Sequence, residues 1–328
     1  MWRLVLVLSL GALVARTAAA DPLVIGEFPF VRVVDGDTIK VEGLDASLRL
    51  LGLDTEETFK HAKERRAYAA GWTSYVKGVR GASPRPVKFA TPMGDEAKAW
   101  AEQFFKGVTT VRLERDDIDE IRDRYNRYLA YVLVQRDGKW VNYNVEAVRA
   151  GMAPYFPKYG TSRRFHAEFV KAEAEAKAAH RGIWDPAKQA YPDYAEREAW
   201  WGARGAFVDA FRAEETGDAK ATAIDLSHEH AEAQLETAAA GLEVDVLGTV
   251  GKIYNQRPAR VMLEGRQPVP VIFFDHALFE ASKIGAWQGE FIVVHAVPRW
   301  YHKHLELVVE RLDQIRFSDL PRTSPPAP

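Results

Sequence analysis

Apolar and polar residues alternate along the chain from Val24 to Asp54, with turn-forming pairs at Asp35-Gly36 and Glu42-Gly43. A period of two is typical of half-buried strands, so this stretch predicts strands at residues 26–34, 37–42 and 47–53. The same alternation returns after residue 108. It predicts two further strands, at residues 109–115 and 128–135.

Between and after these strands, apolar residues recur at helical spacing. Asp95 is a good N-cap for a helix that runs to Gly107 with one apolar face. Two more helices are predicted at residues 144–151 and 163–181, and Gly182 is a typical stop for the second of them. Residues 24–186 are therefore predicted to form an α+β domain that is mostly β.

The second half of the chain opens with a helical and mixed connecting segment, residues 187–241, and then alternates again. The order of elements is three strands, a helix and two strands, at residues 243–254, 258–264, 269–275, 277–284, 290–297 and 304–315. This is the order of the OB-fold, a five-stranded Greek-key barrel that often binds oligonucleotides. We predict a second β-rich, OB-like domain at residues 242–317 and a disordered Pro/Ser-rich tail at 318–328.

The N-terminus has a different pattern from the rest of the chain. After Arg3 come twelve apolar or small residues, Leu4 to Ala15, followed by Arg16 and the small residues Ala18-Ala19-Ala20. This pattern predicts a secretory signal peptide at residues 1–20 and an exported protein, periplasmic or secreted. A membrane anchor would need about 18 apolar residues, and no later stretch approaches that length, so no membrane span is predicted.

The composition excludes sites that depend on cysteine, and the charged residues are unevenly distributed along the chain. The 328 residues include no cysteine, which excludes disulfides and thiolate sites, and the formal net charge is −2. Residues 24–186 nevertheless carry 27 basic and 24 acidic side chains, and the basic insertion 58–91 carries eight against one. This segment is either a solvated surface or a contact for phosphate groups.

Three short blocks, residues 34–39, 49–57 and 123–131, combine carboxylates and arginines at the ends of predicted strands. Phosphodiester hydrolysis needs a hard cation on oxygen ligands, a base for water, and guanidinium groups for the phosphate. Alternation places Arg49 on the same strand face as Leu51 and Leu53, which is unusual unless it is paired or functional. Asp37 and Asp54 follow neighbouring strands and could meet at one rim of a barrel.

These blocks, with V-R-A-G-M-A and a later Gly-Ile-Trp, resemble a staphylococcal-type thermonuclease domain over about residues 25–186. The resemblance implies an OB-type five-stranded barrel with three helices. It also implies calcium-dependent hydrolysis of DNA and RNA, acting as an endonuclease that leaves 3′-phosphates.

Matching the family motifs assigns roles to individual residues. Asp37, Asp54 and the backbone carbonyl of Thr55 match the Ca²⁺ ligands. Glu57 matches the glutamate that activates water, and Arg49 and Arg127 match the two phosphate-binding arginines. Tyr125, Tyr155 and Tyr159 match tyrosines that contact the phosphate or nucleotide of the substrate.

The sequence departs from the family pattern in three places. The usual D-T-P-E reads Asp54-Thr55-Glu56-Glu57, so a proline is lost and Glu56 either points to solvent or perturbs the metal site. Asn126 stands where glycine is usual, and Asn tolerates the left-handed backbone conformation. The basic insertion follows directly after Glu57. If it contacts substrate phosphates, neutralising Lys63, Arg65 and Arg66 should raise the Michaelis constant for DNA.

Two further interpretations stay open. A barrel of this kind can be a catalytically inactive nucleic-acid- or protein-binding module, but retention of the acids and both arginines favours the enzyme. The segment Arg299-Trp300-Tyr301-His302-Lys303-His304 falls between the last two predicted strands, where OB-folds bind ligands. It is either a single-strand contact or a surface that packs on the neighbouring domain.

Overall fold

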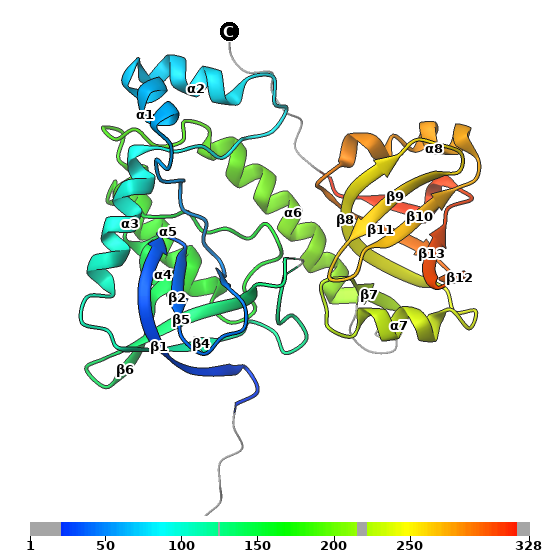
Figure 1. The fold of residues 1–328 in the computed structure, drawn as a ribbon, viewed down its shortest axis with the longest axis horizontal. Helices are drawn as coiled ribbons and strands as arrows, with labels where there is room; N and C mark the ends of the chain where they lie inside the picture. The colour runs from blue at the N-terminus through cyan, green and yellow to red at the C-terminus, as the bar shows by residue number, and fades with distance from the viewer. Residues whose placement is uncertain (1–20, 124, 215–221, 320–328) are drawn as a thin grey trace, which may run out of the picture.

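The computed structural model describes residues 21–123, 125–214 and 222–319. The predicted signal peptide, residues 1–20, and most of the predicted tail, residues 318–328, lie outside the described residues. Within the described part of the chain, no helix is long and apolar enough to cross a membrane. Two sheets with associated helices form an α+β structure (Figure 1).

The first sheet has the strand order β2-β1-β4-β5-β3, with β6 added beside β5. All pairs are antiparallel except β3 with β5. In the described residues no ladder joins β2 to β3, so the expected barrel is an open sheet. Leu51 and Gly52 form a turn after β3, with Gly52 at a φ of +72°, which keeps β3 short. The strands are β1 Val24–Asp35, β2 Thr38–Val41, β3 Leu48–Leu50, β4 Thr110–Glu114, β5 Tyr128–Arg136 and β6 Lys139–Asn142.

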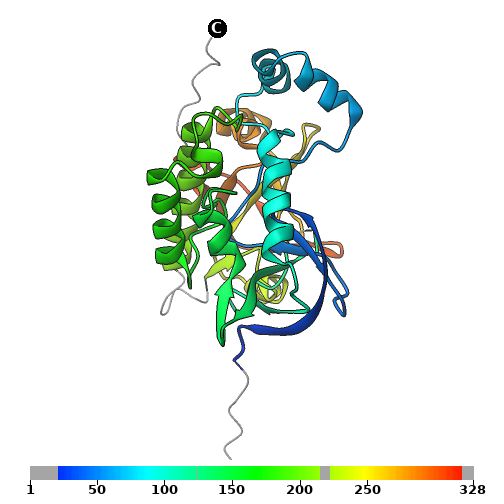
Figure 2. The ribbon, with the colours of Figure 1, turned by 90° about the vertical axis from the view of Figure 1, so that its left-hand side faces the viewer.

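The predicted helices of this half are present with shifted ends. The first predicted helix begins at Pro92 rather than Asp95, because Thr91 accepts a hydrogen bond from the Gly94 amide as the N-cap and proline suits the first turn. The basic insertion forms two short helices that project beyond the end of α3 (Figures 1 and 2). The helices are α1 Ala62–Ala69, α2 Trp72–Arg80, α3 Pro92–Phe104, α4 Tyr143–Arg149 and α5 His166–Ala178, followed by the 3₁₀ turn η1 Gly182–Trp184.

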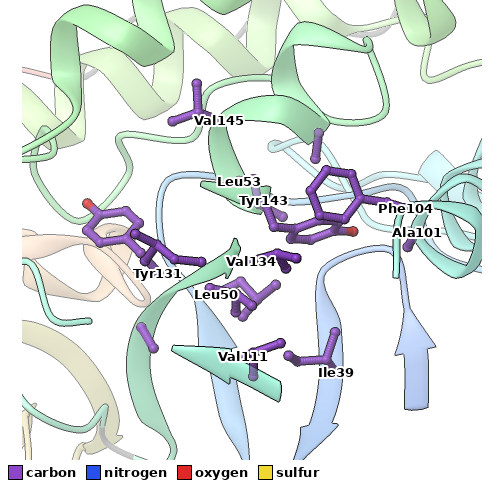
Figure 3. Close-up of a cluster of buried hydrophobic side chains, with 14 of the residues drawn as sticks. Ile39, Leu50, Leu53, Ala101, Phe104, Val111, Tyr131, Val134, Tyr143 and Val145 are labelled. Carbon is purple, nitrogen blue, oxygen red and sulfur yellow. The ribbon is translucent and has the colours of Figure 1, made fainter. Parts of the chain in front are cut away.

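Buried side chains from the strands and from α3, α4 and α5 form the core of the first half (Figure 3). Leu50 and Leu53 flank the turn that precedes the candidate site, and both are buried. Tyr143 packs against Phe104 and donates a hydrogen bond to the carbonyl of Gly36. The core therefore fixes the ends of β1 and β3 from the inside.

A long helix, α6 Tyr194–Glu214, joins the two halves (Figure 1). Its buried Arg204 pairs with the equally buried Glu290, which directly precedes β11. Further along α6, Arg212 contacts Asp225 of the second half at 3.4 Å and Glu120 of the first half at 3.0 Å. The two halves are thus held through the same helix.

The second sheet has the order β12-β13-β10-β9-β8-β11-β14, with β7 beside β8. The predicted strand 304–315 is two strands, β13 and β14, separated by the turn η4, and the strand β12 was not predicted. The elements are β7 Ala223–Asp225, α7 Ala231–Ala238, β8 Val244–Tyr254, β9 Ala259–Glu264, β10 Val269–Phe273, α8 His276–Ser282, η3 Ile284–Trp287, β11 Phe291–Ala296, β12 Arg299–Tyr301, β13 His304–Val308, η4 Leu312–Gln314 and β14 Ile315–Phe317.

Both sheets share one pattern of strand pairing. The first main strand, β1 or β8, pairs antiparallel with the second and the fourth, and the third runs parallel to the fifth, as β3 with β5 and β10 with β13. In both sheets, helices lie between the third and the fourth strand. The sheets differ in which neighbouring pair is left unjoined among the described residues: β2 and β3 in the first, β11 and β13 in the second.

Candidate active site

Arg49 brings the two predicted metal-binding carboxylates together. Its Nη1 lies 3.3 Å from Asp37 Oδ2, and its Nη2 lies 2.7 Å from Asp54 Oδ1. Arg49 extends from β3, Asp37 lies in the turn between β1 and β2, and Asp54 follows β3. Arg49 is unusual as a charged residue on a strand with buried neighbours. Its ion pairs with carboxylates in two neighbouring turns explain why it lies there.

Two glycines allow the surrounding segments to approach the site. A Cβ at Gly36 would lie 2.8 Å from the Thr55 side chain and 2.9 Å from Ala97 of α3. A Cβ at Gly94 would lie 2.1 Å from the Glu57 carbonyl oxygen. The Glu57 carbonyl also accepts a hydrogen bond from the Thr91 amide at 3.0 Å. The N-terminus of α3 thus packs directly on the backbone of loop 54–57.

The basic insertion contributes cations to the site. Lys88 Nζ lies 2.6 Å from Asp54 Oδ1 and 4.0 Å from Glu57 Oε1. Lys60 Nζ lies 3.1 Å from Glu57 Oε2 and 3.3 Å from Asp35 Oδ2. The two ends of insertion 58–91 therefore reach the carboxylates, whereas α1, which carries Lys63 and Arg66, projects away from the sheet (Figure 2).

The pKa values of Asp37 and Asp54 shift in opposite directions. Burial raises the pKa of Asp37, and the negative charge of Asp54 adds to this effect, while Arg49 opposes it. Burial also acts to raise the pKa of Asp54, but Lys88 and Arg49 outweigh it and lower that pKa to about 2. Burial acts to lower the pKa of Arg49, but the two carboxylates raise it above its usual range. The pKa values of Asp37, Asp54 and Arg49 are thus set by burial together with the opposite charges that these groups place beside one another.

Glu56 does not point to solvent, so that sequence-based alternative was wrong, while its effect on the metal site stays a prediction. Its carboxylate is buried, and it accepts hydrogen bonds from the Thr91 hydroxyl, the Tyr191 amide at 2.7 Å and the Tyr194 hydroxyl at 2.7 Å. Tyr191 and Tyr194 lie about 135 residues further along the chain, so no local pattern predicts the contact. Glu56 ties loop 54–57 to the start of α6.

Arg127 is paired with a carboxylate of its own turn, Asp123. Its Nε and Nη2 donate to the Asp123 carboxylate at 2.8 and 2.5 Å, and its guanidinium lies 5.4 Å from the centre of the Tyr125 ring. Asn126 between them has a φ of +62°, as its tolerance for left-handed backbone suggested. Tyr125 is largely exposed, in a position open to a ligand. Roles for Arg127 and Tyr125 in substrate binding stay predictions.

The two other predicted tyrosines differ in environment. Tyr155 is buried, stacks on Phe169 at 4.8 Å, accepts a hydrogen bond from the Ser162 amide and contacts His166 Nδ1. Its hydroxyl is thus engaged within the core. Tyr159 is half exposed, beside the ring of Phe291 from the second half. Tyr159 remains the more accessible candidate for a nucleotide contact.

Lys158 gives a testable pH dependence. Burial and the charge of Arg204 lower its pKa from 10.5 to about 7, against the opposing effects of Asp54 and Glu290. Between about pH 7 and pH 10 the unfolded chain therefore binds more protons at this residue, and the free energy of unfolding should rise with pH. Lys158→Met removes this pH dependence. The free energy of unfolding of the variant should therefore exceed that of the wild type by more at pH 6 than at pH 10. Urea denaturation at both pH values measures it, and an equal gain at both would contradict the shift.

Comparison with known proteins places this arrangement in a family. Residues 47–186, which include Arg49, Asp54, Glu57 and Arg127, match the staphylococcal nuclease homologue family. The chain belongs to that family.

Similar proteins support the staphylococcal nuclease assignment. An uncharacterized protein of Methanocaldococcus jannaschii is 31% identical over 157 residues, covering 47% of this chain and 70% of that protein. A thermonuclease of Staphylococcus hyicus is 28% identical over 162 residues, 48% of this chain and 75% of its own length. A thermonuclease of Staphylococcus intermedius is 27% identical over 161 residues, 47% of this chain and 73% of its own length.

The staphylococcal nuclease family implies calcium, and the oxygen ligands present fit such an ion. Asp54 is buried and Asp37 partly buried, their mutual repulsion helps to raise the pKa of Asp37, and a hard cation would relieve that repulsion. The described residues contain no group of three or more His, Cys, Asp or Glu side chains arranged to hold a metal. A backbone oxygen, as predicted for Thr55, and water would have to complete the shell. Lys88 and Arg49 occupy the same carboxylate oxygens in this structure.

Proposed function

We propose that this chain is a calcium-dependent nuclease, exported by its N-terminal segment, that hydrolyses phosphodiester bonds of DNA or RNA. The observation that carries the proposal is the bridge from Arg49 to Asp37 and Asp54, with Glu57 in the same loop. Distant similarity to thermonucleases supports it. The pairing pattern shared by the two sheets supports an OB-type fold for both halves.

The predicted metal-binding and catalytic residues each have a role in the proposed mechanism. Calcium, when bound by Asp37, Asp54 and the Thr55 carbonyl, would polarise a phosphate oxygen. Glu57 accepts a proton as water attacks phosphorus in line, the new P–O bond forms, and the bond to the 5′-oxygen breaks. That oxygen takes a proton from water and leaves as a 5′-hydroxyl. Arg49 and Arg127 donate to the equatorial oxygens as negative charge develops there. The chain end that is released keeps a 3′-phosphate.

This mechanism requires Arg49 and Arg127 to change partners. Both guanidinium groups are paired with carboxylates in the structure, Arg49 with Asp37 and Asp54 and Arg127 with Asp123. Binding of calcium and a phosphodiester would exchange these partners for phosphate oxygens. The carboxylates thus hold the arginines near the site before substrate arrives.

A direct test compares cleavage of single- and double-stranded DNA in calcium and in chelator, by the mature protein and by Arg127→Ala. We expect cleavage only in calcium and a loss of about 100-fold or more in Arg127→Ala, the scale for removing one donor to developing charge. Arg136→Ala, at a surface arginine hydrogen-bonded to the Phe104 carbonyl, is the matched control. Cleavage that ignores both chelator and Arg127→Ala would overturn the proposal, and no cleavage by the wild type would favour a binding module.

Lys88 gives a second prediction for the same site. Since its ammonium group occupies an Asp54 oxygen, calcium must displace it, so Lys88→Met should bind calcium several-fold more tightly. Isothermal titration calorimetry without nucleic acid measures this directly. Lys98→Met, at a lysine on the middle of α3, serves as the control for loss of one positive charge. Unchanged affinity in Lys88→Met would show that the ammonium group does not compete.

A further inference from the structure

The second half of the chain has a large cavity of its own. Its volume is about 1090 Å³, and its wall comes from β9, β10, the hairpin β12–β13, the loop after β8 and helix α7. In the pairing pattern described above, β9 and β10 are the second and third strands, and β12 lies in the connection between the fourth and fifth. OB-folds bind ligands on these strands and at the equivalent loops.

Exposed aromatic rings line this cavity. The side chains of Phe274, Trp300 and Tyr301 are 66%, 54% and 60% exposed. Tyr254 lines the same cavity, with Arg260 4.5 Å and Lys252 4.8 Å from its ring centre. Large exposed rings gathered on one face indicate a binding surface, because they gain free energy only when another group covers them.

Basic residues gather on the same elements. Residues 242–317 hold nine Lys or Arg and nine Asp or Glu. Six of the nine basic residues lie in two stretches, 252–274 and 299–306, which hold two of the nine acidic ones. Three of these six, Arg260, Arg266 and Lys303, line the cavity together with the exposed rings.

We propose that this face binds single-stranded nucleic acid. Unpaired bases would stack on Trp300, Tyr301 and Phe274, and the phosphates would lie near Arg260 and Lys303. Unpaired bases are required, since in a duplex their faces are covered by neighbouring pairs. The aromatic and basic side chains thus match the two features that single strands expose.

Acidic residues also line the cavity and restrict where phosphates can lie. They are Glu232 and Glu236 of α7 and Glu306 of β13, while Glu229 is paired with Arg266. These carboxylates would repel phosphates, so the backbone is expected to lie near Arg260 and Lys303 and away from α7. This site goes beyond the proposed nuclease centre and does not depend on catalysis.

The hairpin β12–β13, which carries Trp300 and Tyr301, lies on the side of the second half away from the first half (Figure 1). A substrate bound to it and cut at the Arg49 cluster would therefore have to be long enough to reach both. Loss of the second site should weaken the use of polymers and leave a mononucleotide phosphodiester unaffected. This difference separates the two proposals.

The test uses the mature protein in chelator, so that nothing is cleaved, and fluorescence anisotropy of a labelled oligothymidylate of about 20 nucleotides. The double variant Trp300→Ala/Tyr301→Ala should raise its dissociation constant by about 10-fold or more, because one stacked base contributes about 1–3 kcal/mol. Trp140→Ala, at a partly exposed tryptophan of β6, is the matched control and should change nothing. In Arg260→Gln/Lys303→Gln, the slope of log affinity against log salt should fall by about 1.

Three outcomes decide between the possibilities. An unchanged dissociation constant in the aromatic double variant overturns the proposal. An equal loss for double-stranded DNA also overturns it, since stacking on unpaired bases would then not be the cause. Hydrolysis of a nitrophenyl ester of thymidine 3′-phosphate is measured in calcium beside these assays. If the wild type fails to hydrolyse it while single-strand binding depends on Trp300 and Tyr301, the nuclease proposal fails and this one stands.

Discussion

Replacing Glu56 by alanine is expected to lower the free energy of unfolding by about 3 kcal/mol and to reduce nuclease activity at a temperature where the variant is still folded. The change removes the acceptor for three buried donors, on Thr91, Tyr191 and Tyr194. Each donor left without a partner costs about 1–3 kcal/mol. Loop 54–57 would also lose its attachment to α6. Urea denaturation and kcat/KM measured on the same preparations test both effects.

Glu56→Gln is the matched control for this prediction. Its amide oxygen can still accept from Tyr191 and Tyr194, and its amide nitrogen can donate to the Thr91 hydroxyl. Most of the stability and activity should therefore return. Burial raises the pKa of Glu56, so the folded protein favours the protonated carboxyl, and the cost of Glu56→Ala should be larger at pH 4 than at pH 7. If Glu56→Ala proves as stable and active as the wild type, the buried hydrogen bonds of Glu56 do not position loop 54–57.

Asp54→Asn is expected to reduce calcium-dependent cleavage by more than about 100-fold, because even the loss of a group that only supports a metal ligand costs about 10–100-fold. The variant should also lose about 2 kcal/mol of stability at neutral pH, since the pKa of Asp54 is lowered to about 2. That contribution is present above the unfolded pKa of 3.8 and disappears as the pH falls toward 2. Calcium titration and DNA cleavage provide the two readouts.

Asp225→Asn provides a control with the same burial and a similar partner. Asp225 is buried, it pairs with Arg212, and its pKa is lowered although burial acts to raise it. It belongs to β7 in the second half. We expect it to lose stability and to keep the activity of the remaining folded protein. Equal loss of activity in both variants would mean that the effect of Asp54→Asn arises from stability alone.

The predicted elements of the first half follow from local pattern, and their ends follow from local chemistry, but β6 was not predicted. Alternation located β1, β2 and β4, and the shift of α3 to Pro92 follows from a cap at Thr91 that was one turn earlier than the predicted Asp95. The open edge between β2 and β3 was not predicted, because it depends on how early the chain turns at Gly52. In the second half, β12 was missed because it is a three-residue strand in a segment interpreted as a loop.

The candidate site was predictable only where motif spacing carried the information. Asp37, Arg49 and Asp54 lie within 18 positions and share a cluster, as the strand pattern suggested. Lys88 reaches Asp54 from 34 positions away, within an insertion where eight basic residues look alike in sequence. Two of the partners of Glu56, Tyr191 and Tyr194, are about four times as distant. Such long-range contacts depend on how distant segments pack together, and the local sequence around either residue does not predict them.

The hydrogen bonds of Glu56 also bear on where the first domain ends. The family match stops at residue 186, yet Tyr191 and Tyr194 follow it, with Tyr191 packed on Phe89 and Tyr194 on Tyr191. A protein that ends at residue 186 would keep every predicted site residue and would still expose the buried face of the insertion. The smallest fragment able to fold as the first domain should therefore extend into α6 beyond Tyr194, which makes the start of that helix part of the domain rather than a linker.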